Sequence, residues 1–541
     1  MPVMPIPISP REWRRILALT ALILLAASLP YWLAYAVPAG HVFTGILFNP
    51  QDGQSYLAKM REGWRGSWLF TLPYTAEPGR GVFIYSYYLG LGHLARWAGL
   101  SLELVNHLAR IVAGAFLLLT AYHFIAHFFA TARARLGVWL LFALGSGLGW
   151  LAAPLGGFTS DLWVAEAIPF LSVYSSSHFC LAAGLMLWVL EWTLVKEEGE
   201  GEKEKGRRKK ENGKRLVGTA LAVTALAQIQ PMVLPVLGVV VGALTALEVA
   251  REMKRRQWSL SQLLIWPGWQ PPVVVGVCAA PWLIYDVWVT LTQPQLAGWS
   301  AQNVTPSPPL WDAVLSGGVP LALAVLGGAV AVRRRKPQAV MALAWLGLNG
   351  LLLYAPLALQ RRLSLGIWMP IVILAGLGWQ EIIWPRLAKP GRILAVAGIA
   401  LLALPSNLLV YVATLSAVHQ RLPQIFLTQG EAAALDWLAE TASNKIVLAS
   451  PEISLFIPTH TDASVIYGHP FETVEAAAHK RAVEDFFSGR VSPEAFFAQY
   501  PVEYVFYGPR ERQLGALPAL SGWHAVFSSP GETDEVTIYG R

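Results

Sequence analysis

A short segment near the amino terminus places a carboxylate among small polar residues. Asn49-Pro50-Gln51-Asp52-Gly53 follows the first long apolar run of the chain. A carboxylate partly shielded from water can accept a proton from an attacking hydroxyl or amide, as a general base does. The same spacing suits a helix that begins at Pro50 after an Asn49 N-cap, where an acid in the first turn complements the helix dipole. Asp52 is the predicted catalytic residue, and both interpretations can hold together.

A pair of arginines, Arg361 and Arg362, lies between two apolar runs whose other ends carry the basic clusters 333–336 and 386–392. Loops rich in Lys and Arg stay on the cytoplasmic side, so the pair is expected outside. Arginine at bilayer depth costs about 2.5 to 3.5 kcal/mol, which a bound anion would offset. A guanidinium fork matches phosphate in a bidentate way. The pair is predicted to hold a phosphate; the alternative is snorkelling to lipid headgroups or pairing with loop carboxylates.

Further polar residues of the expected outer loops are candidates for substrate contacts. Asp161 and Glu166 could join Asp52 as a second acid or as metal ligands, and the alternative is solvent-exposed loop charge. His123 and His127 have helical i, i+4 spacing, which favours a place near the cytoplasmic interface over a metal site. The predicted substrate-binding residues are Arg361, Arg362, Arg110, Glu77, Asp161, Glu166 and His178, with Asp312 as another polar outer-loop residue.

The composition requires that a membrane positions these residues. Apolar residues make up 55% of the 541 and charged residues only 14%, whereas a soluble domain carries about 25% charged residues. An ordinary soluble enzyme is therefore excluded. The excess of basic residues lies in clusters between apolar runs, so it predicts topology and not nucleic-acid binding. Cys180 and Cys278 lie far apart inside apolar runs, which indicates no disulfide framework.

The apolar runs predict about eleven transmembrane helices, with the amino terminus inside and the carboxyl terminus outside. A long outer loop, 38–103, follows the first helix, and its apolar part 82–100 is expected at the membrane interface. Segment 196–215 is rich in Lys, Arg and Glu and is predicted to be a disordered cytoplasmic loop. The expected helices are 16–37, 104–130, 136–155, 178–195, two within 216–250, 272–290, 313–332, 339–359, 363–383 and 393–417.

The composition changes near His419, where charged residues become frequent and short Val/Ile/Tyr runs alternate with helical patterns. The expected division is a transmembrane domain, 1–417, and a small soluble extracytoplasmic α/β domain, 418–541. The predicted fold class is thus a mainly α polytopic membrane protein with an α/β tail. Helices are expected at 431–441 and 474–487, and strands at 445–450, 464–467 and 503–507.

These features together resemble the GT-C superfamily of integral membrane glycosyltransferases. They are an acid in the first outer loop, an apolar interfacial segment, Gly99-Leu100-Ser101, a helix with Arg110 near its outer end, and an outer tail domain. Members include oligosaccharyltransferases, protein O-mannosyltransferases and lipid A aminoarabinose transferases. The resemblance covers most of the chain and implies sugar transfer from a polyprenyl-phosphate-linked donor, usually with inversion at the anomeric carbon. Many members carry two adjacent acids in this loop; here Gln51 precedes Asp52, a departure that argues against a metal-assisted mechanism.

The predicted function is a glycosyltransferase of the cell (plasma or inner) membrane, acting on its outer face. Asp52 would be the general base, and Arg361 and Arg362 would hold the donor phosphate. The expected partners are a polyprenyl-phosphate-linked sugar, membrane lipid and an acceptor that the sequence does not name, with no nucleic acid. The sequence names no cofactor and leaves dependence on a divalent metal open. Two other classes stay open: a transporter or flippase of a lipid-linked solute, and a non-enzymatic scaffold with an outer binding domain.

Overall fold

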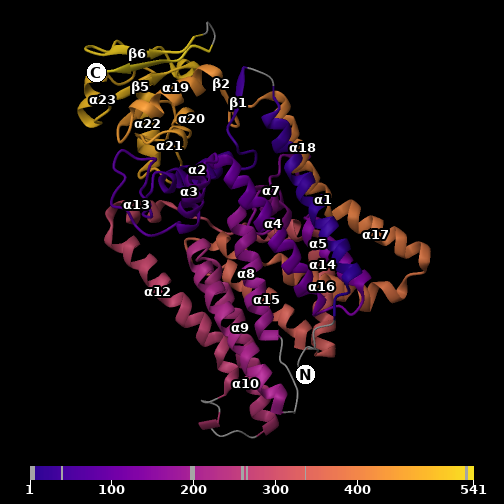
Figure 1. Ribbon diagram of the computed structural model, residues 1–541. Coiled ribbons are helices and arrows are strands. Elements are labelled where there is room, and N and C mark those ends of the chain that lie inside the picture. Colours follow the sequence, from indigo (N-terminus) through magenta and orange to yellow (C-terminus); the bar gives the residue numbers. More distant parts are fainter. Residues whose placement is uncertain are drawn as a thin grey trace. The chain divides into compact units, whose positions relative to one another are not determined.

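The computed structural model describes residues 7–37, 40–194, 202–256, 261–262, 266–335, 337–530 and 534–541. The chain is mainly helical, as the sequence predicts, and forms two compact units (Figure 1). The first unit comprises Met1–Ala27, Arg110–Tyr285 and Thr305–Val412; the second comprises Ser28–Ala109, Asp286–Val304 and Ala413–Arg541. The tail therefore shares a unit with the first loop. The expected domain boundary after residue 417 stays a prediction.

Apolar helices make up most of the first unit. Figure 1 shows α8, α9 and α10 running side by side. Four helices, α1, α4, α12 and α18, contribute residues to both units. The helices are α1 (Pro10–Tyr35), α4 (Leu102–Ala126), α5 (Ala132–Leu144), α6 (Gly149–Ala152), α7 (Pro169–Ser175), α8 (Ser177–Leu194), α9 (Glu202–Ile229), α10 (Val233–Arg256), α12 (Gln270–Thr292), α14 (Leu310–Arg334), α15 (Pro337–Leu353), α16 (Trp368–Gly378), α17 (Lys389–Ala403) and α18 (Pro405–Gln420), with short turns η1 (Ala153–Leu155), η2 (Ser160–Leu162), η3 (Pro267–Trp269), η4 (Gln360–Ser364), η5 (Trp379–Ile383) and η6 (Trp384–Arg386).

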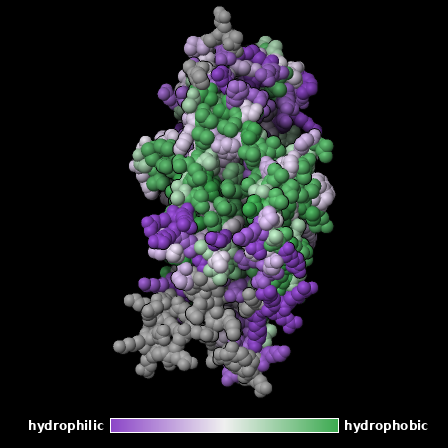
Figure 2. Space-filling model, turned by 90° about the vertical axis from the view of Figure 1, so that its right-hand side faces the viewer, coloured by the Kyte–Doolittle hydropathy of each residue, from purple (hydrophilic) through white to green (hydrophobic). Residues whose placement is uncertain are grey.

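Several of these helices can cross a bilayer. Within the described residues, α1, α4, α10, α12 and α14 are long and apolar enough, and the count reaches seven if two bent helix pairs each form one span. Figure 2 shows hydrophobic side chains, in green, exposed over much of the visible surface, and Leu22, Ile284 and Leu394 are each more than half exposed. Lipid is the solvent that accommodates such a surface. The chain is thus a multi-pass membrane protein, and the count of eleven stays a prediction.

The helix predicted at 136–155 is interrupted, which corrects the sequence-based expectation. It ends at Leu144, and the backbone from Gly145 to Leu148 bonds to other segments: the Ser146 N–H donates to the Ala403 carbonyl and the Leu148 N–H to the Leu315 carbonyl. A Cβ on Gly147 would lie 2.4 Å from the Leu315 carbonyl oxygen. The glycine run therefore permits a close approach of backbone to α14.

A second correction concerns the predicted loop 196–215. Helix α9 begins at Glu202, and only residues 196–201 of that segment lie outside the described part of the chain. Glu, Lys and Arg have good helix propensity, and the segment continues directly into an apolar helix at Leu216. High charge alone did not prevent helix formation here.

The second unit combines the first loop with the tail. Strand β1 (His41–Phe43) pairs antiparallel with β2 (Phe426–Thr428), and the core of the tail includes Ala58 and Tyr74 of the first loop. The loop contributes α2 (Pro50–Trp64) and α3 (Ser86–Ala98), and the segment before residue 304 contributes α13 (Pro294–Gln302). The tail adds α19 (Gln429–Thr441), α20 (Pro451–Ser454), α21 (Ile457–His460), α22 (Ala476–Phe487), α23 (Pro493–Gln499) and α24 (Pro509–Leu514).

The tail has the predicted α/β character. Its five-stranded sheet has the order β4-β3-β5-β7-β6, in which β3 is parallel to β4 and β5, and β7 is antiparallel to β5 and β6. Thr428 and Glu431 form a capping box that starts α19, and Glu431 also binds Arg510 at 2.9 Å. The strands are β3 (Ile446–Leu448), β4 (Ser464–Val465), β5 (Tyr504–Tyr507), β6 (His524–Ser528) and β7 (Thr537–Gly540).

Candidate active site

Asp52 lies in the first turn of α2, as the helix-start interpretation predicts. Asn49 is at the expected N-cap position, but its side chain does not cap the helix. Asn49 has a left-handed backbone (φ 48°), whereas an N-cap residue needs the extended region, and its side chain makes no capping bond. Instead the Asn49 amide donates to Asp52 Oδ2 at 2.5 Å. The Asp52 side chain is 43% exposed, so a substrate can reach its carboxylate.

A buried histidine of the tail faces this carboxylate. His469 Nε2 lies 3.7 Å from Asp52 Oδ1, an ion-pair distance too long for a hydrogen bond. His469 Nδ1 accepts hydrogen bonds from the backbone N–H groups of Phe471 and Glu472, each at 3.1 Å. Because Nδ1 is an acceptor, the ring proton of the neutral form must be on Nε2, which faces Asp52. The imidazole can therefore orient the Asp52 carboxylate or stabilise its charge.

A buried ion pair lies two helical turns further along α2. Lys59 Nζ is 2.6 Å from Glu472 Oε1, and the Ser55 hydroxyl donates to the same oxygen at 2.5 Å. Burial raises the pKa of Glu472, but the nearby charges of Lys59 and His469 and the bonds from Lys59 and Ser55 outweigh it, so the pKa is lowered from its usual value. Glu472 is therefore ionised near neutral pH, and it fixes the loop that carries His469 against α2.

Asp52, Ser55, Lys59 and Glu62 share one face of α2, with the spacing of a helical stripe. Glu62 accepts hydrogen bonds from the Thr71 backbone and hydroxyl. Burial raises the pKa of Glu62 to about 7, despite the opposing effect of these bonds. Asp52, Lys59 and Glu62 thus place three titratable groups along one side of α2.

The loop after α2 carries Glu77, one of the predicted substrate-binding residues, and its side chain is exposed. The loop is anchored nearby, because Tyr74 is fully buried, its hydroxyl donates to the Leu455 carbonyl at 3.1 Å and its carbonyl accepts from Thr473 at 2.7 Å. Glu77 thus lies on a fixed loop of the second unit, accessible to solvent.

The arginine candidates lie in the first unit. The Arg361 guanidinium carbon is 4.5 Å from the centroid of the Trp163 ring, and the Arg361 backbone N–H donates to the Thr305 carbonyl at 3.0 Å. Its Nε is buried and makes no hydrogen bond to the described residues. Arg362 neighbours it in the same turn, η4. A stacked guanidinium with a spare donor is suited to an anion.

Arg110 is buried and donates from its guanidinium to the Val173 carbonyl at 3.2 Å, which ties α4 to α7. His178 is buried at the start of α8, with its ring centroid 3.9 Å from that of Phe179. Glu166 lines a small, mostly apolar cavity with Met186 and Trp368. These three candidates therefore have contacts inside the first unit.

Asp161 is fully buried, which excludes an exposed loop charge at this position. It accepts hydrogen bonds from the Gly149 backbone at 3.0 Å and the Thr159 hydroxyl at 2.7 Å. The Ser316 hydroxyl lies between the two acids, 3.2 Å from Asp161 and 2.8 Å from Asp312. The structure thus pairs Asp161 with Asp312 and gives both carboxylates donors from the chain itself.

Comparison with known proteins shows which fold carries these residues. No family model matches the sequence, and no curated protein matches it. The oligosaccharyltransferase AglB from Archaeoglobus fulgidus, solved with an inhibitory peptide and a dolichol-phosphate, superposes with a TM-score of 0.56 at 12% identity, over 93% of this chain and 70% of AglB. The chain has the GT-C fold. The mycobacterial arabinofuranosyltransferase AftD gives a TM-score of 0.51 at 13% identity, over 99% of this chain and 42% of AftD.

Within the GT-C fold of this chain, sequence reasoning found Asp52 but missed His469, Glu472 and Lys59. Lys59, in the middle of α2 and four residues after Ser55, could have indicated a buried ion pair, because a cation on the buried face of a helix needs an anion. Nothing in the local sequence identified Glu472 as that anion, since 413 positions separate the two residues.

Proposed function

We propose that this GT-C chain is a glycosyltransferase that moves a sugar from a polyprenyl-phosphate-linked donor to an acceptor at the extracytoplasmic face of the cell membrane. The observation that carries the proposal is the accessible Asp52 carboxylate, held between Asn49 and the buried His469. The fold supports it, and so does the dolichol-phosphate in the AglB structure.

In the proposed reaction, Asp52 accepts a proton from the acceptor hydroxyl or amide. The acceptor atom forms a new bond to the anomeric carbon while the bond from that carbon to the phosphate oxygen breaks, which inverts the configuration. The polyprenyl phosphate leaves with the bonding electrons. Arg361 and Arg362 hold the donor phosphate and offset its developing charge, which makes it a better leaving group.

The other candidates have lesser roles in this proposal. Glu77 is exposed and free to meet an acceptor, whereas Arg110, Asp161 and His178 are buried and position the backbone around them. Glu166 contributes to the lining of its cavity.

The proposed topology has eleven transmembrane helices, a cytoplasmic amino terminus and an extracytoplasmic tail. The basic residues Arg11, Arg14 and Arg15 in the first turns of α1 support it, as do the clusters 333–336 and 386–392.

The lipid-linked sugar pool tests the proposed class of function. In cells that lack the chain, we expect the donor to accumulate and its glycan product to disappear, as measured by mass spectrometry of extracted lipids and surface glycans. The intact chain should restore both. An unchanged donor pool would contradict a transferase, and a donor confined to the cytoplasmic leaflet would indicate a flippase instead.

A further inference from the structure

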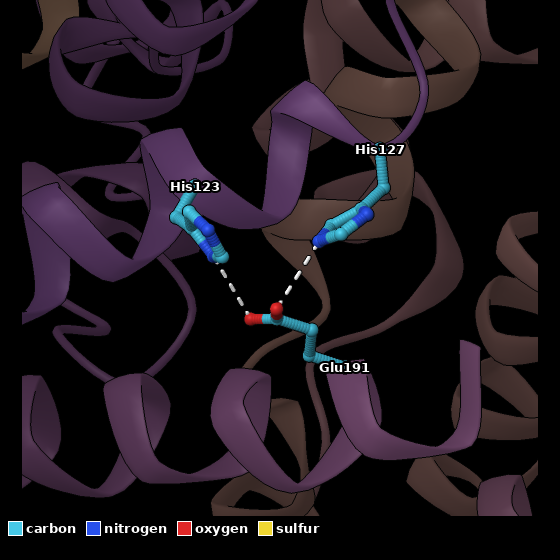
Figure 3. Close-up of side chains that lie close together, drawn as sticks. All are labelled: His123, His127 and Glu191. Carbon is cyan, nitrogen blue, oxygen red and sulfur yellow. Dashed lines mark hydrogen bonds and ion pairs between the residues drawn. The ribbon is translucent and has the colours of Figure 1, made fainter. Parts of the chain in front are cut away.

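A cluster at the ends of α4 and α8 lies outside the proposed active site. Figure 3 shows His123, near the end of α4, and His127, just after it, turned toward the Glu191 carboxylate of α8. His123 Nδ1 is 3.0 Å from Glu191 Oε2, and His127 Nε2 is 3.2 Å from Glu191 Oε1. One ligand atom from each residue lies within 4.8 Å of the others.

These spacings match those around a shared transition-metal ion. Ligands about 2.0–2.2 Å from a tetrahedral Zn²⁺ lie roughly 3.4 Å from one another. The two separations, 3.0 and 3.2 Å, run to different oxygens of the Glu191 carboxylate, and each needs only a small widening to admit the ion. Two imidazoles and one carboxylate are also a ligand set that Zn²⁺ takes, whereas Ca²⁺ and Mg²⁺ prefer oxygen ligands alone.

Burial favours a ligand role for His127. Its side chain is 2% exposed, and its Nε2 lies within ion-pair distance of Glu191 Oε1, at 3.2 Å. In the neutral imidazole, a lone pair on Nε2 can be directed at an ion that His127 shares with Glu191. His123 is held in place as well, because its ring stacks on Trp13 with centroids 6.5 Å apart.

We propose that His123, His127 and Glu191 bind a Zn²⁺ ion, with water in the fourth position. The ion ties the end of α4 to the end of α8. The His123 side chain is 44% exposed, so solvent has a route to the site. The proposal is independent of the glycosyltransferase assignment, because none of its ligands belongs to the proposed active site.

Zn²⁺ titration of the full chain in detergent, after chelator treatment, tests the site. We expect one tightly bound Zn²⁺ per chain, a rise in unfolding temperature on Zn²⁺ addition, and tetrahedral d–d absorption bands when Co²⁺ replaces it. Glu191→Gln and His127→Ala should weaken Zn²⁺ binding by more than the roughly 10- to 100-fold that loss of an outer-shell partner causes.

Matched controls keep this test decisive. His419→Ala and Glu440→Gln remove an exposed histidine and an exposed acid elsewhere in the chain, and both should bind Zn²⁺ as the intact chain does. The half-exposed His123→Ala provides a ligand variant if His127→Ala does not fold. Failure of the intact chain to bind Zn²⁺ at micromolar concentration would overturn the proposal, as would equal affinity in the Glu191→Gln and His123→Ala variants.

Discussion

At the scale of single residues, the proposed catalysis depends on how Asp52 is held. The sequence predicted the acid and the helix start at Pro50, because both follow from a local spacing. It could not predict His469, which comes from the tail and reaches Asp52 only after the first loop and the tail have folded into one unit. Asn49 precedes the helix as predicted, but the sequence did not reveal its left-handed backbone or the absence of a capping bond from its side chain.

His469 is a positioning residue in this account. Replacing His469 by Asn should lower the turnover number about 10- to 100-fold and leave the KM for the donor nearly unchanged, because the imidazole acts through Asp52, whose general-base contribution is about 10²–10⁴-fold. The activity–pH profile should also change shape. Steady-state kinetics across pH check this, and a rise in KM with an unaltered turnover number would contradict it.

Arg361 is expected to contribute to donor binding. Arg361→Ala should raise the KM for the lipid-linked donor about 10- to 100-fold, since a hydrogen bond to a charged group is worth about 1.5–3 kcal/mol. Arg361→Lys should recover only part of this, because an ammonium cannot reproduce the bidentate fork or the stack on Trp163. Donor titrations at fixed acceptor measure it, and equal KM values in all three proteins would favour snorkelling to lipid.

At the scale of elements, the tail was predictable and the membrane helices less so. The strands at 445–450, 464–467 and 503–507 and both tail helices were found in place, because each has a clear period of two or 3.6 residues. The break after Leu144 was missed, since uninterrupted apolar character conceals the backbone contacts that Gly147 permits. Strands β6 and β7 were also missed.

The Lys59–Glu472 ion pair joins α2 to the tail loop. Glu472→Gln should destabilise the second unit by about 3–5 kcal/mol, because it leaves the ammonium of Lys59 buried without an anion. The double variant Lys59→Met, Glu472→Leu should recover much of the loss. Asp485→Asn, which removes an exposed ion pair with Arg490, should cost at most about 1 kcal/mol. Chemical denaturation followed by tryptophan fluorescence measures the unfolding free energy of all three variants. Equal losses of stability in Glu472→Gln and Asp485→Asn would contradict a stabilising role of the buried Lys59–Glu472 pair.

Glu472 also predicts how stability depends on pH. Its pKa in the folded chain is below the ordinary value of 4.5, so its contribution is fully present above pH 4.5 and is lost as the pH falls through the folded pKa. The difference in unfolding free energy between the intact chain and Glu472→Gln should therefore be constant from pH 7 to about 5 and shrink below it. A difference that grows on acidification would contradict the ionised state of Glu472.

At the scale of the whole molecule, composition was enough to predict a multi-pass membrane protein, but not the number of spans. In the part of the chain that the structure describes, five helices meet the length and hydropathy expected of a span, and two bent pairs raise this to seven. Hydropathy alone does not decide whether a broken helix crosses the bilayer or turns back within it. The two units likewise could not be predicted, because each gathers segments from distant parts of the chain.

Cysteine labelling tests the proposed topology. In a chain whose Cys180 and Cys278 have been replaced by Ala, a cysteine at the exposed Ser521 of the tail should react with a membrane-impermeant maleimide in intact cells. A cysteine at Gly213, in the basic stretch of α9, should react only after permeabilisation. Labelling of the Gly213 position alone in intact cells would reverse the proposed orientation.

The most direct test of the central claim is turnover of the donor by the purified chain in nanodiscs, with the lipid-linked sugar that accumulates in cells lacking it. The intact chain and Asp436→Asn, which alters an exposed acid of the same unit, should release polyprenyl phosphate at the same rate. Asp52→Asn, present at the same level, should be slower by about 10²–10⁴-fold, the contribution expected of a general base. Release by Asp52→Asn at the rate of the intact chain would contradict the account.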